Sequence, residues 1–100
     1  MFRRQTPSFE QTTDWEAWKA DGGAILDVRE PQEWAMGTLP DSIKISMGEI
    51  PNRLDDLPEE KILVVCRSGN RSMTVANWLS RQGYEVANLT GGLVRQGMRA

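Results

Sequence analysis

The sequence predicts an α/β fold in which a mostly parallel central sheet carries helices on both faces, giving three layers. The first observation is that short apolar runs alternate with helical patterns along the chain, an order that implies parallel strands joined by right-handed crossovers. The second is that Asp27-Val28-Arg29 and Cys66 lie at the ends of two predicted strands. Because ligands bind beyond the carboxyl ends of parallel strands, we expect the functional site there.

Length and composition favour one globular domain spanning residues 1–100. The 100 residues include 39% hydrophobic residues, enough for a core at a common domain size. Twelve basic and 14 acidic residues leave a net charge of −2, which argues against a nucleic-acid-binding surface. The sequence has neither an apolar stretch long enough for a membrane span nor a secretory signal. We therefore expect a cytoplasmic protein with no nucleic-acid or membrane partner.

In the N-terminal half, Phe9 is placed to anchor a short edge strand. Thr13 and Glu16 have the spacing of a capping box, so we expect a helix with Thr13 as its N-cap. This helix should end at Gly22-Gly23. The other elements predicted here are strands at 24–28 and 43–45, a helix at 30–36 with Pro31 in its first turn and Gly37 after it, and a helical turn at 51–57 led by Pro51.

In the C-terminal half, the apolar run 61–65 is rich in β-branched residues and predicts a buried strand. A helical pattern over 72–82, with Gly83 as its stop signal, follows it. Residues 86–89 predict another strand, and Gly91-Gly92 a turn into a short helix. Four tryptophans have a spacing that favours core packing over a stacking surface: Trp15, Trp18, Trp34 and Trp78.

Cys66 is the only cysteine, and the chain has no histidine, so a disulfide framework, a zinc site and a Cys–His dyad are not expected. It lies between a strand and a helix start, where backbone N–H groups can form an anion-binding nest. Gly69 permits a positive φ in this loop, and Arg67 and Arg71 add positive charge. These features predict a partly exposed nucleophilic thiolate. The alternative is a small buried apolar side chain.

The stretch Cys66-Arg67-Ser68-Gly69-Asn70-Arg71-Ser72 resembles the active-site loop of the rhodanese family, the thiosulfate-type sulfurtransferases. The resemblance also includes Leu26–Pro31, Glu33-Trp34 and Asn88–Gly92, and extends over most of the chain. It implies a rhodanese-like three-layer fold without a cofactor or metal. It also implies that Cys66 takes sulfur from a small anionic donor such as thiosulfate, forms a persulfide, and passes the sulfur to a thiol or cyanide.

The resemblance implies roles for the residues around Cys66. Arg67, Ser68, Gly69, Asn70 and Arg71 are expected to bind the donor and, through inward backbone amides, the persulfide. Arg71 can instead pair with a carboxylate, since a cation opposes the dipole at a helix start. Three further residues are expected to support the loop: Asp27, Arg29 and Ser72. For Ser72, we favour a role as helix cap over a role as hydrogen-bond donor to the sulfur.

Loop length separates the reactions that the resemblance allows. Four residues lie between Cys66 and Arg71, and the resemblance implies sulfur transfer at this length, whereas rhodanese-like phosphatases have one residue more. Two rivals remain open: a sulfur-carrier module that relays sulfur to a protein partner and turns over thiosulfate poorly, and a binding domain with an inert thiol. The chain departs from the family pattern at Thr38, Pro40-Asp41-Ser42 and Val94, positions that concern the site rim and C-terminal packing.

Overall fold

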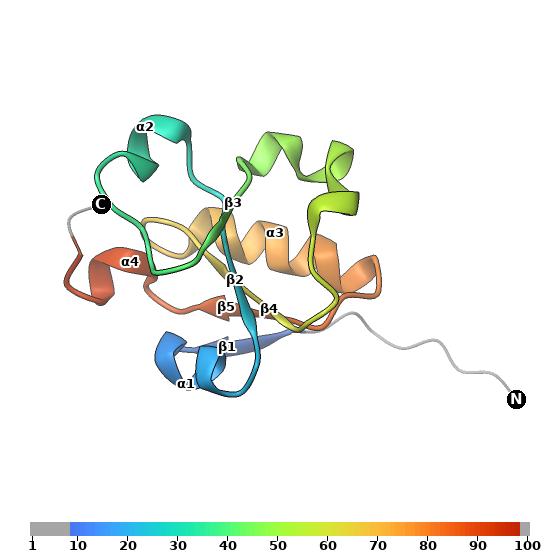
Figure 1. Cartoon of the computed structure of the whole chain (residues 1–100), viewed down its shortest axis with the longest axis horizontal. Coiled ribbons are helices and arrows are strands. Elements are labelled where there is room, and N and C mark those ends of the chain that lie inside the picture. The colour runs from blue at the N-terminus through green and yellow to red at the C-terminus, as the bar shows by residue number, and fades with distance from the viewer. Residues whose placement is uncertain (1–8, 99–100) are drawn as a thin grey trace, which may run out of the picture.

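A five-stranded parallel sheet forms the centre of the molecule (Figure 1), with the strand order β1-β5-β4-β2-β3. The computed structural model describes residues 9–98 of the chain; residues 1–8 and 99–100 of the predicted domain lie outside the described part. The predicted parallel α/β architecture is confirmed. The strands are β1 (Glu10–Thr12), β2 (Ala24–Asp27), β3 (Ile43–Lys44), β4 (Ile62–Val65) and β5 (Val86–Leu89).

Helices cover both faces of this sheet, which makes the three layers. They are α1 (Trp15–Ala20), α2 (Pro31–Trp34), η1 (Met47–Asn52), η2 (Leu54–Asp56), α3 (Asn70–Arg81) and α4 (Gly92–Arg95), where η denotes a 3₁₀ helix. Figure 1 shows α3 and α1 on opposite sides of the sheet. None of the helices within residues 9–98 is both long and apolar enough to span a membrane.

The alternation of side chains along β4 divides the core in two. Ile62 and Val64 pack into a cluster with Val75 and Leu79 of α3, whereas Leu63 and Val65 of the same strand belong to a second cluster. That second cluster contains residues of α1 and α4, including Trp18 and Leu93. Because successive side chains of a strand point to opposite faces, one apolar run serves both cores.

The predicted N-cap of α1 is wrong by one residue. Asp14, not Thr13, is the N-cap, and its side chain accepts a hydrogen bond from the Ala17 amide at 2.9 Å. Asp caps a helix at least as well as Thr. Both neighbouring residues were therefore suitable N-caps, and the sequence pattern alone did not decide between them. A capping box occurs instead in α2, between Glu30 and Glu33.

The predicted first residue of the helical turn at 51–57 is also wrong. The chain forms η1 from Met47, with Pro51 inside it, and then η2. The Glu49 amide donates to the Ser46 carbonyl at 2.9 Å, so the first turn precedes the proline. Ile50 is 2% exposed and anchors η1 in the first core. The strand at 43–45 and the helix at 30–36 are likewise shorter than predicted.

Candidate active site

Cys66 lies at the carboxyl end of β4, where a short loop leads into α3 at Asn70. Gly69 is the N-cap of α3, with a left-handed φ of 101°. That conformation disfavours residues with a Cβ atom, which explains the glycine. The predicted order of strand, tight loop and helix start is therefore confirmed.

Two backbone amides converge on the sulfur of Cys66. The Gly69 N–H lies 3.1 Å from Sγ and the Ser72 N–H lies 3.3 Å from it. The thiol also lies 3.3 Å from the hydroxyl of Ser72. Donors that point at one sulfur stabilise negative charge on it, because a thiolate is a better acceptor than a thiol.

Helix α4 determines the orientation of the loop peptides. The Leu93 amide donates to the Cys66 carbonyl at 2.9 Å and the Val94 amide to the Arg67 carbonyl at 3.0 Å. These two bonds fix the first two peptides of the loop against α4, and the amides that reach the sulfur come from Gly69 and Ser72, farther along the chain. Gly92 makes this approach possible, since a Cβ there would lie 2.3 Å from the Arg67 carbonyl oxygen.

The partial exposure expected for the thiol is wrong. Cys66 is 1% exposed, because the loop, the start of α3 and the start of α4 enclose it. Two surface cavities within residues 9–98 are lined by other side chains. A reactant can therefore reach Sγ only if part of this enclosure moves.

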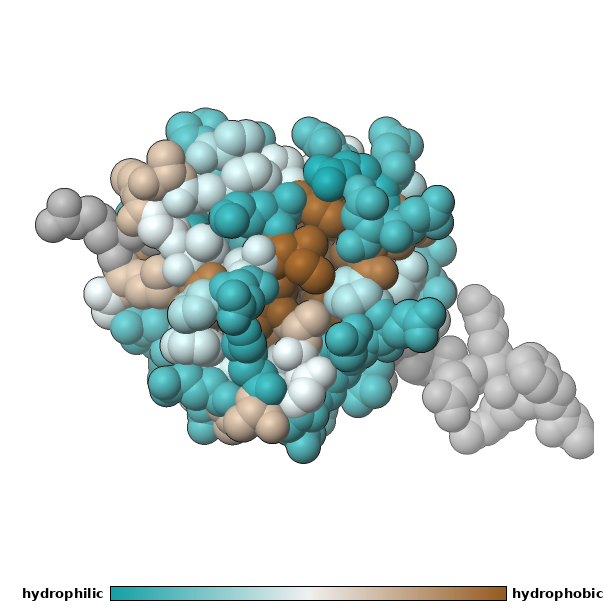
Figure 2. All heavy atoms as spheres, viewed as in Figure 1, coloured by the Kyte–Doolittle hydropathy of each residue, from teal (hydrophilic) through white to brown (hydrophobic). Residues whose placement is uncertain are grey.

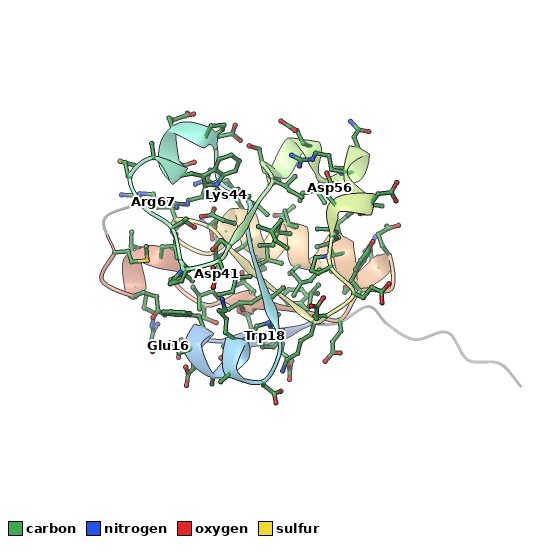
Figure 3. All side chains as sticks on the ribbon, viewed as in Figure 1. Glu16, Trp18, Asp41, Lys44, Asp56 and Arg67 are labelled. Carbon is green, nitrogen blue, oxygen red and sulfur yellow. The ribbon has the colours of Figure 1, made fainter. Side chains whose placement is uncertain are left out.

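The rim of the loop consists of the side chains of Arg67, Ser68 and Asn70, which are all exposed, while Gly69 is buried beneath them. Figure 3 shows Arg67 at the end of the molecule that α2 and α4 form. This position suits contact with an incoming anion.

Arg71 pairs with a carboxylate, the alternative that the sequence left open. Its guanidinium binds Glu33 of α2 with two hydrogen bonds, of 2.7 and 2.8 Å. The pair lowers the pKa of Glu33 to about 2, chiefly through the hydrogen bonds from Arg71, and it raises the pKa of Arg71. Glu33 was not among the predicted site residues, although its place in the third position of a capped helix marks it as a fixed carboxylate.

Asp27 and Arg29 form a fully buried ion pair at the end of β2. The carboxylate accepts hydrogen bonds from the Arg29 backbone and guanidinium and, at 2.7 Å, from the Thr38 hydroxyl. The guanidinium also donates to the Gly37 carbonyl at 2.6 Å. These bonds support the segment that follows α2. A supporting role of Asp27 and Arg29 for the Cys66 loop stays a prediction.

The preference for Ser72 as a helix cap is wrong. Ser72 is the third residue of α3, and its hydroxyl lies among the Cys66 sulfur, the Gly69 carbonyl and the side chain of Asn88. The sequence prediction did not single out Asn88. The signal was present, since Asn88 is the one polar side chain in the otherwise apolar strand Val86–Leu89.

An apolar groove lies beside the site, between η1 and α3. It encloses about 180 Å³ and is lined by Met47, Ile50, Pro51, Thr74, Val75 and Trp78. Figure 2 shows apolar residues in a hollow at the centre of this face.

Trp78 packs at the edge of the first core, and Trp18 is buried in the second core, as predicted. Met73 of α3 is 43% exposed.

Comparison with known proteins connects this geometry with one family. The sequence profile described as "Rhodanese-like domain" matches residues 11–95. The Bacillus subtilis protein named "Putative sulfurtransferase YtwF" is 42% identical over 71 residues, covering 70% of this chain and 69% of that protein. A second B. subtilis protein, named "Putative sulfur carrier protein YrkF", is 37% identical over 71 residues, covering 69% of this chain and 38% of its own length.

The fold has close counterparts among solved structures. The crystal structure of a rhodanese-like domain protein from Staphylococcus aureus superposes with a TM-score of 0.80 at 30% sequence identity. The match covers 92% of this chain and 95% of that one. Both the sequence profile and the architecture therefore extend over nearly all of the described residues.

Proposed function

The chain belongs to the rhodanese-like family of sulfurtransferases and sulfur carriers, and we propose that its Cys66 moves sulfane sulfur from a small anionic donor such as thiosulfate to a thiol or cyanide. The observation that carries this proposal is the convergence of the Gly69 and Ser72 amides on Sγ, at 3.1 and 3.3 Å. Amides in this arrangement favour an anionic sulfur at the centre of the loop.

In the first half-reaction, the Cys66 thiolate attacks the outer sulfur of thiosulfate. A bond forms between Sγ and that sulfur, the sulfur–sulfur bond of the donor breaks, and its electron pair leaves with sulfite. The product is a persulfide anion on Cys66. Every species in this step is an anion that needs no proton, so the lack of histidine in the chain is compatible with it.

In the second half-reaction, cyanide or an acceptor thiolate attacks the terminal sulfur of the persulfide. The bond between that sulfur and Sγ breaks, and its electron pair returns to Cys66 as the thiolate. The backbone amides of residues 67–71 hold the terminal sulfur between the two steps. Arg67, at the exposed rim, meets the sulfonate of the donor, while Arg71 contributes positive charge from its pair with Glu33.

Intact-mass spectrometry tests this proposal directly. The purified protein should gain the mass of one sulfur atom after thiosulfate and lose it after cyanide, with thiocyanate as the product. A Cys66→Ser control should show neither change. A wild-type protein that alkylates at Cys66 but gains no sulfur from thiosulfate would refute the thiosulfate reaction, and hydrolysis of phosphate esters would point to the phosphatase reading.

The second candidate is a sulfur carrier that serves a protein partner. Two observations favour it. Cys66 is 1% exposed, so its reaction with a small donor that does not displace the loop rim should be slow. The chain is also similar to a protein named as a sulfur carrier. Slow thiocyanate formation combined with fast transfer of labelled sulfur from the Cys66 persulfide to a thiol-bearing protein identifies the carrier. Fast turnover with thiosulfate and cyanide identifies the enzyme.

A further inference from the structure

A chain of hydrogen-bonding side chains runs from the sulfur of Cys66 to the edge of the sheet. The thiol contacts Ser72 Oγ at 3.3 Å, and the Ser72 hydroxyl makes a short hydrogen bond to Asn88 Oδ1. The Asn88 amide then donates to Gln11 Oε1 at 3.0 Å, and the Thr90 hydroxyl donates to the same oxygen at 2.9 Å. The path connects α3, β5 and β1.

Two hydrogen-bonded side chains of this path lie in the core, where polar groups lower the stability of the fold unless each has a partner. Ser72 is fully buried and Asn88 is 1% exposed. Gln11 stands opposite Asn88 in the register of the parallel pair β1 and β5, so it extends the path to the exposed edge strand. Each buried member thus has a partner on both sides.

The same atoms can be joined in two opposite directions. In one direction, Cys66 is a thiol that donates to Ser72, Ser72 donates to Asn88 Oδ1, and Asn88 Nδ2 donates to Gln11. In the other, both amides are turned over: Gln11 Nε2 donates to Asn88 Oδ1, Asn88 Nδ2 donates to Ser72 Oγ, and Ser72 donates to the sulfur. Hydroxyl and amide groups allow both, because each contains a donor and an acceptor.

Only the second direction suits a thiolate, which accepts hydrogen bonds and cannot donate one. We propose that Asn88 and Gln11 are positioning residues that stabilise the Cys66 thiolate by reversing this hydrogen-bond chain, so that the Ser72 hydroxyl donates to the sulfur. The inference deepens the proposed sulfur transfer, in which the thiolate is the attacking form, and it adds two residues that never touch the donor.

Charged groups on the loop and on the elements around it act separately from this chain, and Arg71 among them interacts electrostatically with Cys66. They come from the loop and the start of α3 (Arg67 and Arg71), from α2 (Glu33) and from the end of β2 (Asp27 and Arg29). None of these five residues is a member of the path from Ser72 to Gln11. Variants at Asn88 or Gln11 therefore leave the ionic surroundings of Cys66 in place.

The test is a pH titration of the ultraviolet thiolate absorbance, without any sulfur donor. Cys66 is the only cysteine, so the signal is assignable, and a Cys66→Ala protein supplies the background from tyrosine. Asn88→Ala should move the titration midpoint upward by about 0.5–1 pH unit, the effect of one hydrogen bond on one charge state. Asn77→Ala, at an exposed position of the same helix as Ser72, should leave the midpoint unchanged.

A double-mutant cycle separates the relay from general damage. Because Asn88 acts through Ser72, Asn88→Ala should have no further effect on the midpoint in a Ser72→Ala protein. Gln11→Met, at an exposed position of β1, should produce a smaller upward shift. An unchanged midpoint in both Asn88→Ala and Gln11→Met, or full additivity with Ser72→Ala, would overturn the proposal. Because no sulfur is transferred, this result is independent of whether thiosulfate is the donor.

Discussion

Arg71 shows how a single residue can look unfavourable in the sequence and be well placed in the fold. It lies in the first turn of α3, where a cation opposes the helix dipole. Glu33 compensates by binding the guanidinium with both carboxylate oxygens at 2.7 and 2.8 Å. The paired charges hold the start of α3 against α2.

The depressed pKa of Glu33, about 2 against an ordinary value of 4.5, predicts a pH-dependent contribution to stability. The folded state holds this carboxylate ionised more strongly than the unfolded chain does. The contribution is therefore complete above about pH 4.5 and is lost as the pH falls towards about 2. The difference in unfolding free energy between the wild-type protein and Glu33→Gln should shrink over this range.

Urea unfolding at a series of pH values measures this difference. Glu59→Gln, which changes an exposed carboxylate before β4, is the matched control and should show little pH-dependent difference from wild type. A Glu33→Gln difference that stays constant from pH 5 to pH 2 would mean that the ion pair with Arg71 does not persist in solution.

At the scale of elements, the site depends on how closely α4 approaches the loop after β4. The N-terminal amides of α4 bind the carbonyls of Cys66 and Arg67, and Gly92 has a φ of +66° with no room for a Cβ atom. Sequence analysis predicted a turn at Gly91-Gly92 but no contact with the active site. The helix thereby acts as a clamp that orients the loop peptides.

Gly92→Ala should therefore damage both stability and sulfur uptake. A left-handed conformation costs a residue with a Cβ about 1–2 kcal/mol, and the new methyl would also push against the Arg67 carbonyl, 2.3 Å away. We expect a thermal midpoint several degrees lower and slower persulfide formation by intact-mass kinetics.

Gly48→Ala is the matched control, since a Cβ at Gly48 meets no atom within 4 Å. It should retain near-normal stability and sulfur uptake. A Gly92→Ala protein as stable and as reactive as Gly48→Ala would show that α4 does not constrain the loop.

At the scale of the whole molecule, β4 belongs to two cores at once. Its alternate side chains pack with α3 on one face and with α1 and α4 on the other, and Cys66 follows directly at its end. Loss of either core removes support from the same strand. The described residues should therefore unfold as one cooperative unit, as expected for a single domain.

Nuclear magnetic resonance of the tryptophan indole N–H groups can test this cooperativity. Trp18 reports on the second core and Trp78 on the edge of the first. In a urea titration, their native resonances should disappear with the same midpoint. A midpoint for Trp18 clearly below that for Trp78 would indicate that the layer containing α1 unfolds separately.

Local patterns were sufficient to predict the strand at β4, the tight loop at Gly69, and the helix α3 with its stop at Gly83. Each of these depends on neighbouring residues in the chain: β-branched residues before the loop, a glycine within it, and apolar spacing after it. The same kind of evidence misplaced the N-cap of α1, because Thr13 and Asp14 are both good cap residues. It also misplaced the start of η1, because Pro51 marked a first turn that the chain begins earlier, at Met47.

The sequence by itself determined the order of elements, the parallel sheet and the position of the thiol at a strand end, because these follow from short-range periodicity and turn chemistry. Only the tertiary structure decided that Arg71 pairs with Glu33, 38 positions away, and that Asn88 joins Ser72 to Gln11, 77 positions from Asn88. It also decided that Cys66 is enclosed. The physical reason is that a hydrogen-bond partner or a covering side chain is selected by distance in space, and the packing of α2, α4 and β1 around the loop sets those distances.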